Sequence, residues 1–253
     1  MPNLLITGQS GRMGQALMQA AAADPDSQVT ATHDVGQDLD AAVQKANCII
    51  DFTVHSFTAQ VVEAAIKHGT RLVIGTTGHS DAERVVIYEA AKSIRIVYAA
   101  NYSVGVNTLF WLSRHAARIL TQDRFDIEVT EMHHKHKIDA PSGTARRILE
   151  ILNEETGTSY QDDVAHGRFG NIGPRKPREI GMHTLRGGDV VGDHTVLFAA
   201  DGERIELTHK ASSRMTFAAG AVRAASWLED QPVGLYDMQD VLGLVSRKIQ
   251  IVG

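Results

Sequence analysis

Residues 4–14 read Leu4-Leu5-Ile6-Thr7-Gly8-Gln9-Ser10-Gly11-Arg12-Met13-Gly14, and this stretch decides the fold of the chain that follows it. Its first four residues predict a short buried strand, and apolar side chains then recur at the spacing of a helix, at Met13, Leu17, Ala20 and Ala21. Between the two elements, glycines allow a tight turn and a close approach of the backbone, and the start of the helix is electropositive. The stretch therefore predicts a loop that holds the pyrophosphate of a dinucleotide.

The spacing of the three glycines, Gly-x-x-Gly-x-x-Gly, differs from the commoner Gly-x-Gly-x-x-Gly, so a plain turn between a strand and a helix is an alternative. The next predicted strand, residues 28–32, favours the dinucleotide. It ends at His33-Asp34, about 20 residues after Gly14, where an acidic side chain typically meets the ribose of adenosine.

Strands and helices alternate through the first hundred residues. The pattern predicts further strands at 48–52, 72–75 and 94–99, separated by helices at 56–68 and 81–92. This alternation is typical of an α/β fold with a Rossmann-type, doubly wound parallel sheet. Three strand ends would face a cofactor, and they carry small, hydroxyl or amide side chains, although each could also be a simple turn. They are Asp51-Phe52-Thr53, Gly75-Thr76-Thr77-Gly78 and Ala99-Ala100-Asn101-Tyr102-Ser103.

The pattern changes after a helix predicted at 106–120. Four β-rich segments follow with no regular helix between the later ones, at 126–130, 182–185, 194–198 and 204–208. They predict a second, α+β domain with a mixed or antiparallel sheet over residues 105–214. An amphipathic helix at 214–228 returns the chain to the first domain, residues 1–104, which we expect residues 215–253 to complete. The basic, glycine-rich run 166–181 is either a solvated loop or a loop that closes over an acidic ligand.

The segment 131–144, Glu-Met-His-His-Lys-His-Lys-Ile-Asp-Ala-Pro-Ser-Gly-Thr, combines proton-transfer groups with cationic charge. His133, His134 and Lys137 offer hydrogen-bond donors, and imidazoles titrate near neutrality. Ser142 is a suitable N-cap for a helix whose apolar face comprises Ala145, Ile148, Leu149 and Leu152. The helix start at Gly143 and Thr144 would supply backbone N–H groups for an anion. We therefore predict a site for an anion and a proton.

Two other interpretations of this segment stay open at this point. The three imidazoles of His133, His134 and His136 could bind a metal ion, although no helical His-x-x-x-His pair and no acidic or cysteine ligand stands at an obvious spacing. The segment could also be a solvated basic loop without a function. We expect no metal.

The composition argues against several classes of partner and location. The net charge of -5 argues against a nucleic-acid-binding surface. The single cysteine, Cys48, stands in an apolar run and is expected to be a buried packing residue in a reducing compartment. No apolar segment reaches the length of a membrane span, and no secretory signal stands at the N-terminus, so we expect a cytoplasmic protein without a membrane partner.

Taken together, these segments resemble the 4-hydroxy-tetrahydrodipicolinate reductases, also called dihydrodipicolinate reductases. The resemblance covers nearly the whole chain and is most specific in the string His-His-x-x-Lys-x-Asp-Ala-Pro-Ser-Gly-Thr; it also includes the run 208–217, Thr-His-Lys-Ala-Ser-Ser-Arg-Met-Thr-Phe. It implies NAD(P)H-dependent reduction of a cyclic imine dicarboxylate with loss of water, in the diaminopimelate route to lysine. It also implies a homotetramer.

The resemblance assigns roles to individual residues. His133 and Lys137 would be the catalytic acid–base pair, and the dicarboxylate would be bound by His134, Lys137, Ser142, Gly143 and Thr144. The dinucleotide would contact the glycine loop and two later strand ends, through Gly8, Gln9, Ser10, Gly11, Arg12, Met13, Gly75, Thr76, Thr77, Ala99, Ala100, Asn101 and Tyr102.

One departure from the family concerns the cofactor. Members that use NADPH readily often carry Glu-Arg where this chain has His33-Asp34. Asp34 would accept hydrogen bonds from a free ribose diol, whereas the arginine that pairs with a 2'-phosphate is missing. Arg12 could compensate in part. We therefore predict that both NADH and NADPH are used, with NADH preferred.

Three rival functions are weaker. A dinucleotide sensor without catalysis has no need of Lys137 among proton-transfer groups. A semialdehyde dehydrogenase requires a nucleophilic cysteine in its substrate domain, whereas Cys48 lies in the other predicted domain. A metal hydrolase would depend on the imidazoles alone.

Overall fold

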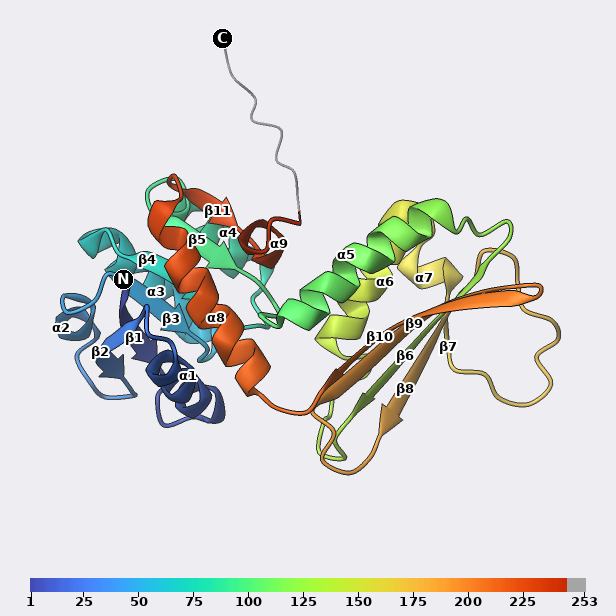
Figure 1. Cartoon of the computed structure of the whole chain (residues 1–253), viewed down its shortest axis with the longest axis horizontal. Helices are drawn as coiled ribbons and strands as arrows, with labels where there is room; N and C mark the ends of the chain where they lie inside the picture. Colours follow the sequence, from blue (N-terminus) through green and yellow to red (C-terminus); the bar gives the residue numbers. More distant parts are fainter. Residues whose placement is uncertain (245–253) are drawn as a thin grey trace, which may run out of the picture. The chain divides into compact units, whose positions relative to one another are not determined.

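The computed structural model describes residues 1–244 and divides them into two compact units (Figure 1). The first unit comprises Met1–Val104 and the described residues from Arg214 onward, and the second comprises Gly105–Ser213. Arg214, which we expected to end the second domain, belongs to the first unit because its carbonyl accepts the first hydrogen bonds of a helix there. The part of the predicted first domain at 245–253 lies outside the described residues.

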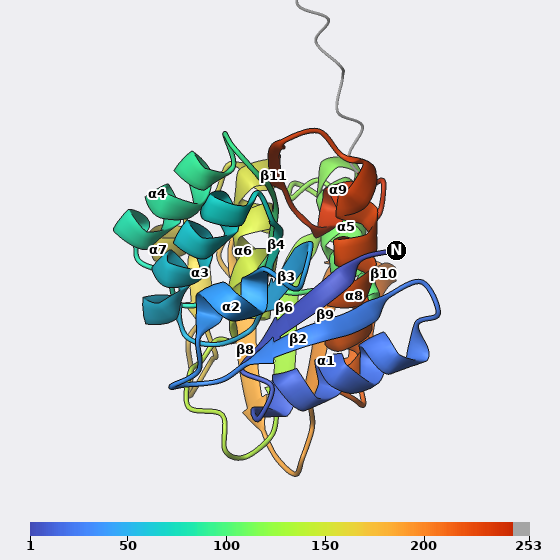
Figure 2. The same cartoon turned by 90° about the vertical axis from the view of Figure 1, so that its left-hand side faces the viewer.

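The first unit is built on six parallel strands in the order β11-β5-β4-β3-β1-β2, which confirms the predicted Rossmann-type sheet (Figure 2). The central strands are buried on both faces, as apolar runs such as Cys48-Ile49-Ile50 require. The strands are β1 (Asn3–Thr7), β2 (Gln28–His33), β3 (Cys48–Asp51), β4 (Arg71–Ile74), β5 (Arg95–Tyr98) and β11 (Gly234–Tyr236).

Helices cover both faces of this sheet, so the fold is doubly wound as predicted. Successive residues of a strand face opposite sides, and the two apolar cores divide accordingly: Leu4 and Ile6 pack with α1 and α8, whereas Leu5 packs with α2, α3 and α4. These helices are α1 (Arg12–Ala23), α2 (Leu39–Val43), α3 (His55–His68), α4 (Asp81–Ala90) and α8 (Met215–Trp227), with a short α9 (Met238–Val241) after β11.

The second unit holds a five-stranded sheet in the order β10-β9-β6-β8-β7. Its β6–β9 and β9–β10 pairs are antiparallel, and its β6–β8 and β7–β8 pairs are parallel, so the sheet is mixed, as predicted. The strands are β6 (Asp126–His133), β7 (Val164–His166), β8 (Ile180–Arg186), β9 (Gly192–Ala200) and β10 (Glu203–Ala211).

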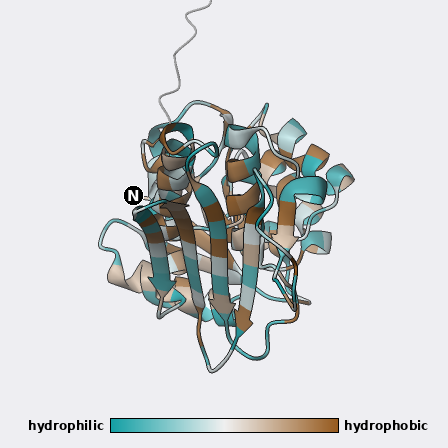
Figure 3. Ribbon diagram, turned by 90° about the vertical axis from the view of Figure 1, so that its right-hand side faces the viewer, coloured by the Kyte–Doolittle hydropathy of each residue, from teal (hydrophilic) through white to brown (hydrophobic). Residues whose placement is uncertain are grey.

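Two long helices, α5 (Val104–Ile119) and α6 (Gly143–Thr156), pack against one face of the mixed sheet, and a short α7 (Tyr160–Asp163) follows α6. The apolar face predicted for residues 145–152 is buried in this core. Among residues 1–244, no helix of this unit covers the opposite face, which carries both polar and apolar stretches (Figure 3). None of the helices within residues 1–244 is both long and apolar enough to span a membrane.

The basic run 166–181 is mostly exposed and irregular, in agreement with the solvated loop that was one of its two predicted forms, and two of its arginines are paired with carboxylates. Arg168 pairs with Glu128 and Glu179, and Arg175 pairs with Glu128 and Asp126, so these two guanidinium groups are bound by the protein's own carboxylates. Burial alone would raise the pKa of Glu128, but its hydrogen bonds from Arg168, His183 and Arg175 outweigh burial and lower it to about 2. The run is therefore tied to β6 by charge.

Candidate active site

The predicted phosphate loop has the backbone that such a site requires. Gly8 adopts φ +65° and its N–H donates to the carbonyl of His33 at 2.7 Å. A Cβ atom on Gly14 would lie 2.1 Å from the carbonyl oxygen of Gly8, so only glycine fits where α1 crosses the loop. Gly11 caps α1, which begins at Arg12. Strand, turn and helix N-terminus follow one another directly, which fits a bound pyrophosphate.

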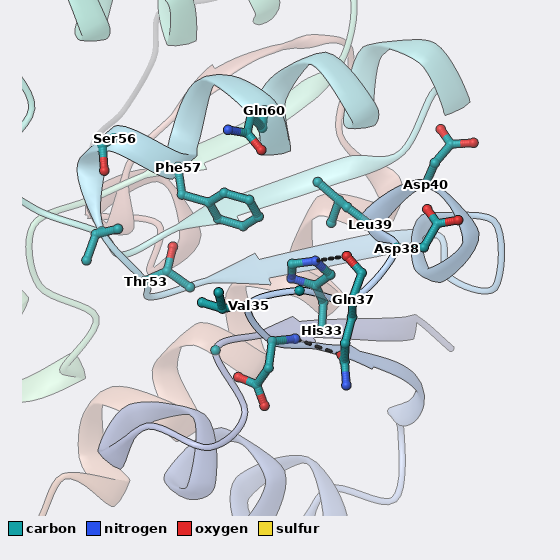
Figure 4. Close-up of a pocket in the computed structure, with 14 residues that line it drawn as sticks. His33, Val35, Gln37, Asp38, Leu39, Asp40, Thr53, Ser56, Phe57 and Gln60 are labelled. Atoms are coloured by element: carbon teal, nitrogen blue, oxygen red, sulfur yellow. Dashed lines mark hydrogen bonds between the residues drawn. The ribbon is translucent and has the colours of Figure 1, made fainter.

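A pocket of about 680 Å³ lies beside this loop (Figure 4). Its lining includes Gly8, Asp34 and Val35 from the first strands and Phe57 from α3. His33 stacks on Phe57 at a centroid distance of 5.4 Å and an interplanar angle of 8°. Ser10 donates to Asp34 through its hydroxyl at 3.1 Å and through its N–H at 3.4 Å, so Asp34 stands at the glycine loop. The volume and lining suit a base and a sugar.

Three strand ends of the first unit are joined by Asp51, which is fully buried. Its carboxylate accepts hydrogen bonds from the hydroxyls of Thr7 and Thr53 at 2.6 Å and of Thr76 at 2.8 Å. The Thr76 hydroxyl, expected at the cofactor, is therefore committed to the protein, whereas Thr77 beside it is exposed. A Cβ atom on Gly75 would lie 2.1 Å from the ring of Phe52, so glycine is required there too.

The strand end after β5 divides into exposed and buried residues. Ala100 is exposed, and Ala99 and Asn101 are half-buried. The side chain of Tyr102 is 1% exposed, and its hydroxyl lies 2.9 and 3.0 Å from the carbonyl oxygens of Ile74 and Val97. Burial raises the pKa of this phenol well above its usual value. The contact with a cofactor that we predict for Tyr102 would therefore be made by its backbone.

In the second unit, β6 places Glu131 and His133 on the same face because the two residues stand two apart on a strand. Nδ1 of His133 lies 2.5 Å from Oε2 of Glu131. The sheet register then adds two groups from neighbouring strands: Arg186 of β8 stands opposite His133, and His194 of β9 stands opposite Glu131. All four side chains consequently meet at one end of the sheet.

His194 links this group to the start of α6. It is 3% exposed, its Nε2 lies 3.2 Å from the hydroxyl of Ser142, and its ring packs edge-on to His133 with centroids 5.2 Å apart. Burial, followed by the nearby charges of His133, His209 and Lys137, lowers its pKa to about 3 against an opposing effect of Glu131. His194 is therefore neutral at physiological pH, and both His133 and Lys137 lie close enough to influence it.

Lys137 pairs with Asp139 at 2.9 Å, with its own side chain 21% exposed. Of the other imidazoles in this segment, His134 is half-buried and His136 is exposed, with ring centroids 6.2 Å apart. Among residues 1–244, no three His, Cys, Asp or Glu side chains are grouped so that they could hold a metal ion.

The start of α6 confirms the predicted cap but changes the role expected of Ser142. Its side chain is 1% exposed and accepts a hydrogen bond from the N–H of Ala145 at 3.1 Å, besides the contact with His194. Both interactions keep the hydroxyl within the protein, so direct binding of an anion by this hydroxyl is not supported. Gly143 is exposed, with open space where a Cβ would stand, and Thr144 is half-buried.

Sequence reasoning named the histidines and Lys137 but gave no role to Glu131, Arg186 or His194. Glu131 had a detectable signal, because an acid two residues before a histidine on a strand shares its face. Arg186 and His194 become neighbours only through the strand register. Cys48 is fully buried, and burial raises its pKa to about 12, so its thiol is the packing group that we predicted.

Comparisons with known proteins agree with this geometry. Family models described as the N-terminus and the C-terminus of dihydrodipicolinate reductase match residues 2–102 and 105–242. A 4-hydroxy-tetrahydrodipicolinate reductase from Akkermansia muciniphila is 61% identical over 96% of this chain and 99% of its own length. One from Chromobacterium violaceum is 47% identical over 96% and 98%.

A solved structure of similar fold is a dipicolinate-bound dihydrodipicolinate reductase from Paenisporosarcina sp. TG-14. It is 21% identical, has a TM-score of 0.76, and the match covers 95% of this chain and 98% of that one. Both domains of the family are thus present along the chain, and its relatives match it over nearly their whole length. The chain belongs to the dihydrodipicolinate reductase family.

Proposed function

We propose that this chain is a 4-hydroxy-tetrahydrodipicolinate reductase, which uses NAD(P)H to reduce 4-hydroxy-tetrahydrodipicolinate to tetrahydrodipicolinate with loss of water, in the diaminopimelate route to lysine. The observation that carries the proposal is the grouping in the second unit. The ring of His133 packs edge-on against that of His194 with centroids 5.2 Å apart, and Nε2 of His194 lies 3.2 Å from the hydroxyl of Ser142, the cap of α6. Acid groups and an anion-binding helix start are therefore neighbours.

The dicarboxylate is assigned to the basic segment and the helix start. Lys137 and His134 supply charge and donors, and Gly143 and Thr144 lie in the first turn of α6, at the electropositive end of the helix. Gly143 is exposed, so its amide can be approached from solvent. Cation and amides together neutralise and orient a dianion.

Reduction of a conjugated imine ring leaves negative charge on nitrogen or carbon, and a positioned acid must supply a proton there. His133 and Lys137 are the candidates, and such catalysis contributes roughly a hundredfold to ten-thousandfold. The same pair assists departure of the 4-hydroxyl group as water. Each contacts a carboxylate: His133 contacts Glu131 at 2.5 Å, and Lys137 contacts Asp139 at 2.9 Å.

The Rossmann-type fold and the family bind NAD(P)H, and the loop geometry fits such a cofactor. When bound, NAD(P)H supplies the hydride. We assign its pyrophosphate to the loop from Gly8 to Met13 and its remaining contacts to two strand ends, Gly75–Thr77 and Ala99–Tyr102. The buried side chains of Thr76 and Tyr102 limit those two residues to backbone contacts.

NADH is the cofactor that we expect to be preferred. Asp34 stands beside Ser10 in the loop and lines the pocket of Figure 4, so a 2'-phosphate placed there would meet its negative charge. Arg12, exposed at the start of α1, offsets part of that repulsion.

A homotetramer is proposed for the assembly. The uncovered face of the mixed sheet carries apolar side chains, among them Leu185 at 48% exposure and the half-buried Met132 and Leu197. Such a face is suited to burial against another copy of the chain. Light scattering coupled to gel filtration tests this through a mass four times that of the chain. The buried thiol of Cys48 is in keeping with a cytoplasmic location.

The experiment that tests the function supplies the product of the preceding synthase together with NADH and follows the loss of NADH absorbance. Substrate-dependent oxidation of NADH by the purified protein is expected, and formation of tetrahydrodipicolinate is checked by mass spectrometry. A protein that binds NADH yet leaves this substrate unreduced would rule the proposal out.

A further inference from the structure

Glu131 is a buried carboxylate between the acid candidate and the anion site of the second unit. It is 0% exposed, although ionised carboxylates are seldom fully buried without partners. Its position on β6 is two residues before His133 and on the same face.

Both oxygens of Glu131 are fully engaged. Oε2 accepts from Nδ1 of His133 at 2.5 Å and from Arg186 at 3.0 Å. Oε1 accepts from Arg186 at 3.0 Å and from the backbone N–H of Ser142 at 3.1 Å. Burial alone would raise the pKa of Glu131, but these hydrogen bonds outweigh it and lower the pKa to about 2. The group is ionised at neutral pH.

This contact determines which nitrogen of His133 exchanges the proton. An ionised carboxylate only accepts, so Nδ1 of His133 carries a hydrogen at all times and Nε2 is left as the nitrogen that gains or loses one. Nε2 faces Gly192 of β9, where a Cβ atom would lie 3.0 Å away. The missing side chain leaves space next to the atom from which the proton would be transferred.

The same carboxylate also orders the helix start. Glu131 accepts a hydrogen bond from the backbone N–H of Ser142, the residue that caps α6. Arg186, which donates to both oxygens of Glu131, also donates to the carbonyl of Asp139 at 2.7 Å. Glu131 therefore joins the proton donor to both ends of the turn that leads into Gly143 and Thr144.

We propose that Glu131 is a positioning residue of the reductase, which fixes the His133 ring with Nε2 as its proton-exchanging atom and fixes the Ser142 turn relative to it. The inference rests on the proposed function. Other charged or titratable groups around His133 are Arg186 on β8 and His194 on β9, and His194 in turn lies near His209 and Lys137. Arg186 neutralises part of the Glu131 charge, so the influence of Glu131 on His133 depends on the direct hydrogen bond between these two side chains.

The central test is Glu131→Gln, which keeps the shape of the side chain and removes its charge. We expect kcat to fall by roughly a hundredfold or more, since a correctly positioned acid–base group contributes a hundredfold to ten-thousandfold. The pH profile of kcat should change as well, because the charge beside His133 is removed. Affinity for NADH, whose site lies in the first unit, should stay within about twofold.

Glu128→Gln is the matched control. Glu128 lies on the same strand with the opposite face, and it too is held by arginine and histidine side chains, but it does not touch His133. Its substitution should lower thermal stability without moving the pH profile. An unchanged pH profile and kcat in Glu131→Gln, or the same change in both variants, would overturn the inference.

A spectroscopic test covers the case in which Glu131→Gln fails to fold. Proton NMR of wild-type protein with 15N-labelled histidine should show a strongly deshielded Nδ1–H signal, which must disappear in a His133→Gln variant. Absence of that signal from folded wild-type protein would contradict the inference. Because the signal needs no turnover, it separates failure of this contact from failure of the proposed function, which the wild-type assay detects.

Discussion

The hydroxyl of Ser10 donates a hydrogen bond to the carboxylate of Asp34 across 3.1 Å. The contact brings the end of β2 to the glycine loop, and it supports the register on which our expectation of the cofactor depends. Asp34 is half-buried, so water and salt screen part of any repulsion from a 2'-phosphate.

Cofactor choice should therefore be a preference and not an exclusion. We expect kcat/KM to favour NADH by a factor on the order of ten, about 1.4 kcal/mol, and Asp34→Arg to shift the ratio toward NADPH. Steady-state kinetics with both cofactors measure this ratio of kcat/KM values. A wild-type enzyme that prefers NADPH, with a ratio that Asp34→Arg leaves untouched, would show that Asp34 does not face the ribose.

Substitution of either member of the acid–base pair should lower turnover without changing the affinity for the cofactor. His133→Gln and Lys137→Ala are each expected to lower kcat by roughly a hundredfold to ten-thousandfold, since general acid catalysis is worth that much. Fluorescence titration should show unchanged NADH binding by both variants. Full activity of Lys137→Ala would remove Lys137 from the proposed mechanism.

A planar pyridine-2,6-dicarboxylate should compete with the substrate, because it presents two carboxylates in a similar arrangement. His134→Ala and Thr144→Val are expected to raise its inhibition constant. For Ser142→Ala, we expect loss of thermal stability of about 1 kcal/mol from the missing helix cap, with little change in inhibition. Inhibition that is insensitive to both His134→Ala and Thr144→Val would place the anion elsewhere.

Gly192→Ala tests the space beside His133. The added methyl group would lie 3.0 Å from Nε2, so the ring must shift by a few tenths of an ångström. We expect kcat to fall on the order of tenfold, since small misplacements of reacting groups are costly. The backbone of Gly192 is outside the left-handed region, so little loss of stability from backbone strain should follow. Wild-type kinetics in this variant would show that Nε2 does not face the substrate.

His194 should make the second unit sensitive to acid. Its pKa is near 3 in the folded protein and 6.5 without the fold, so the unfolded chain binds more protons between these values. Stability is fully present above pH 6.5 and falls with pH, by roughly 3 kcal/mol at pH 4. His194→Gln, whose amide can still reach Ser142, should flatten this dependence in thermal unfolding. His166→Gln, at an exposed position of β7, is the control and should leave it unchanged.

The sequence predicts the fold well where apolar periodicity is long. Strands β1 to β5 and helices α1, α3 and α4 follow from runs such as Leu4–Thr7 and 56–68, and the predicted ranges agree within one or two residues at their ends. Strands β7 and β11 were not predicted, because three residues are too few to show a period of two. Helices α2 and α7 are similarly short.

The candidate site could likewise be predicted only in part. Residues close in sequence, such as His133, Lys137 and the Ser142 cap, are visible as a motif. The burial of Ser142, Thr76 and Tyr102 is not visible, because it depends on partners from other strands. Asp51 shows this best: the sequence places it at a strand end, and only the sheet order brings three threonine hydroxyls to its carboxylate.

The first unit is made from two stretches of chain, with the second unit between them. Strand β11 pairs with β5, and α8 shares an apolar core with α1 and with strand residues such as Val73. A ribosome must therefore translate past residue 236 before this sheet has its edge strand. The second unit is continuous in sequence and has its own core, so it can fold first during synthesis. Until α8 emerges, the part of the apolar sheet face that α8 covers is left exposed beside α1 in the nascent first unit.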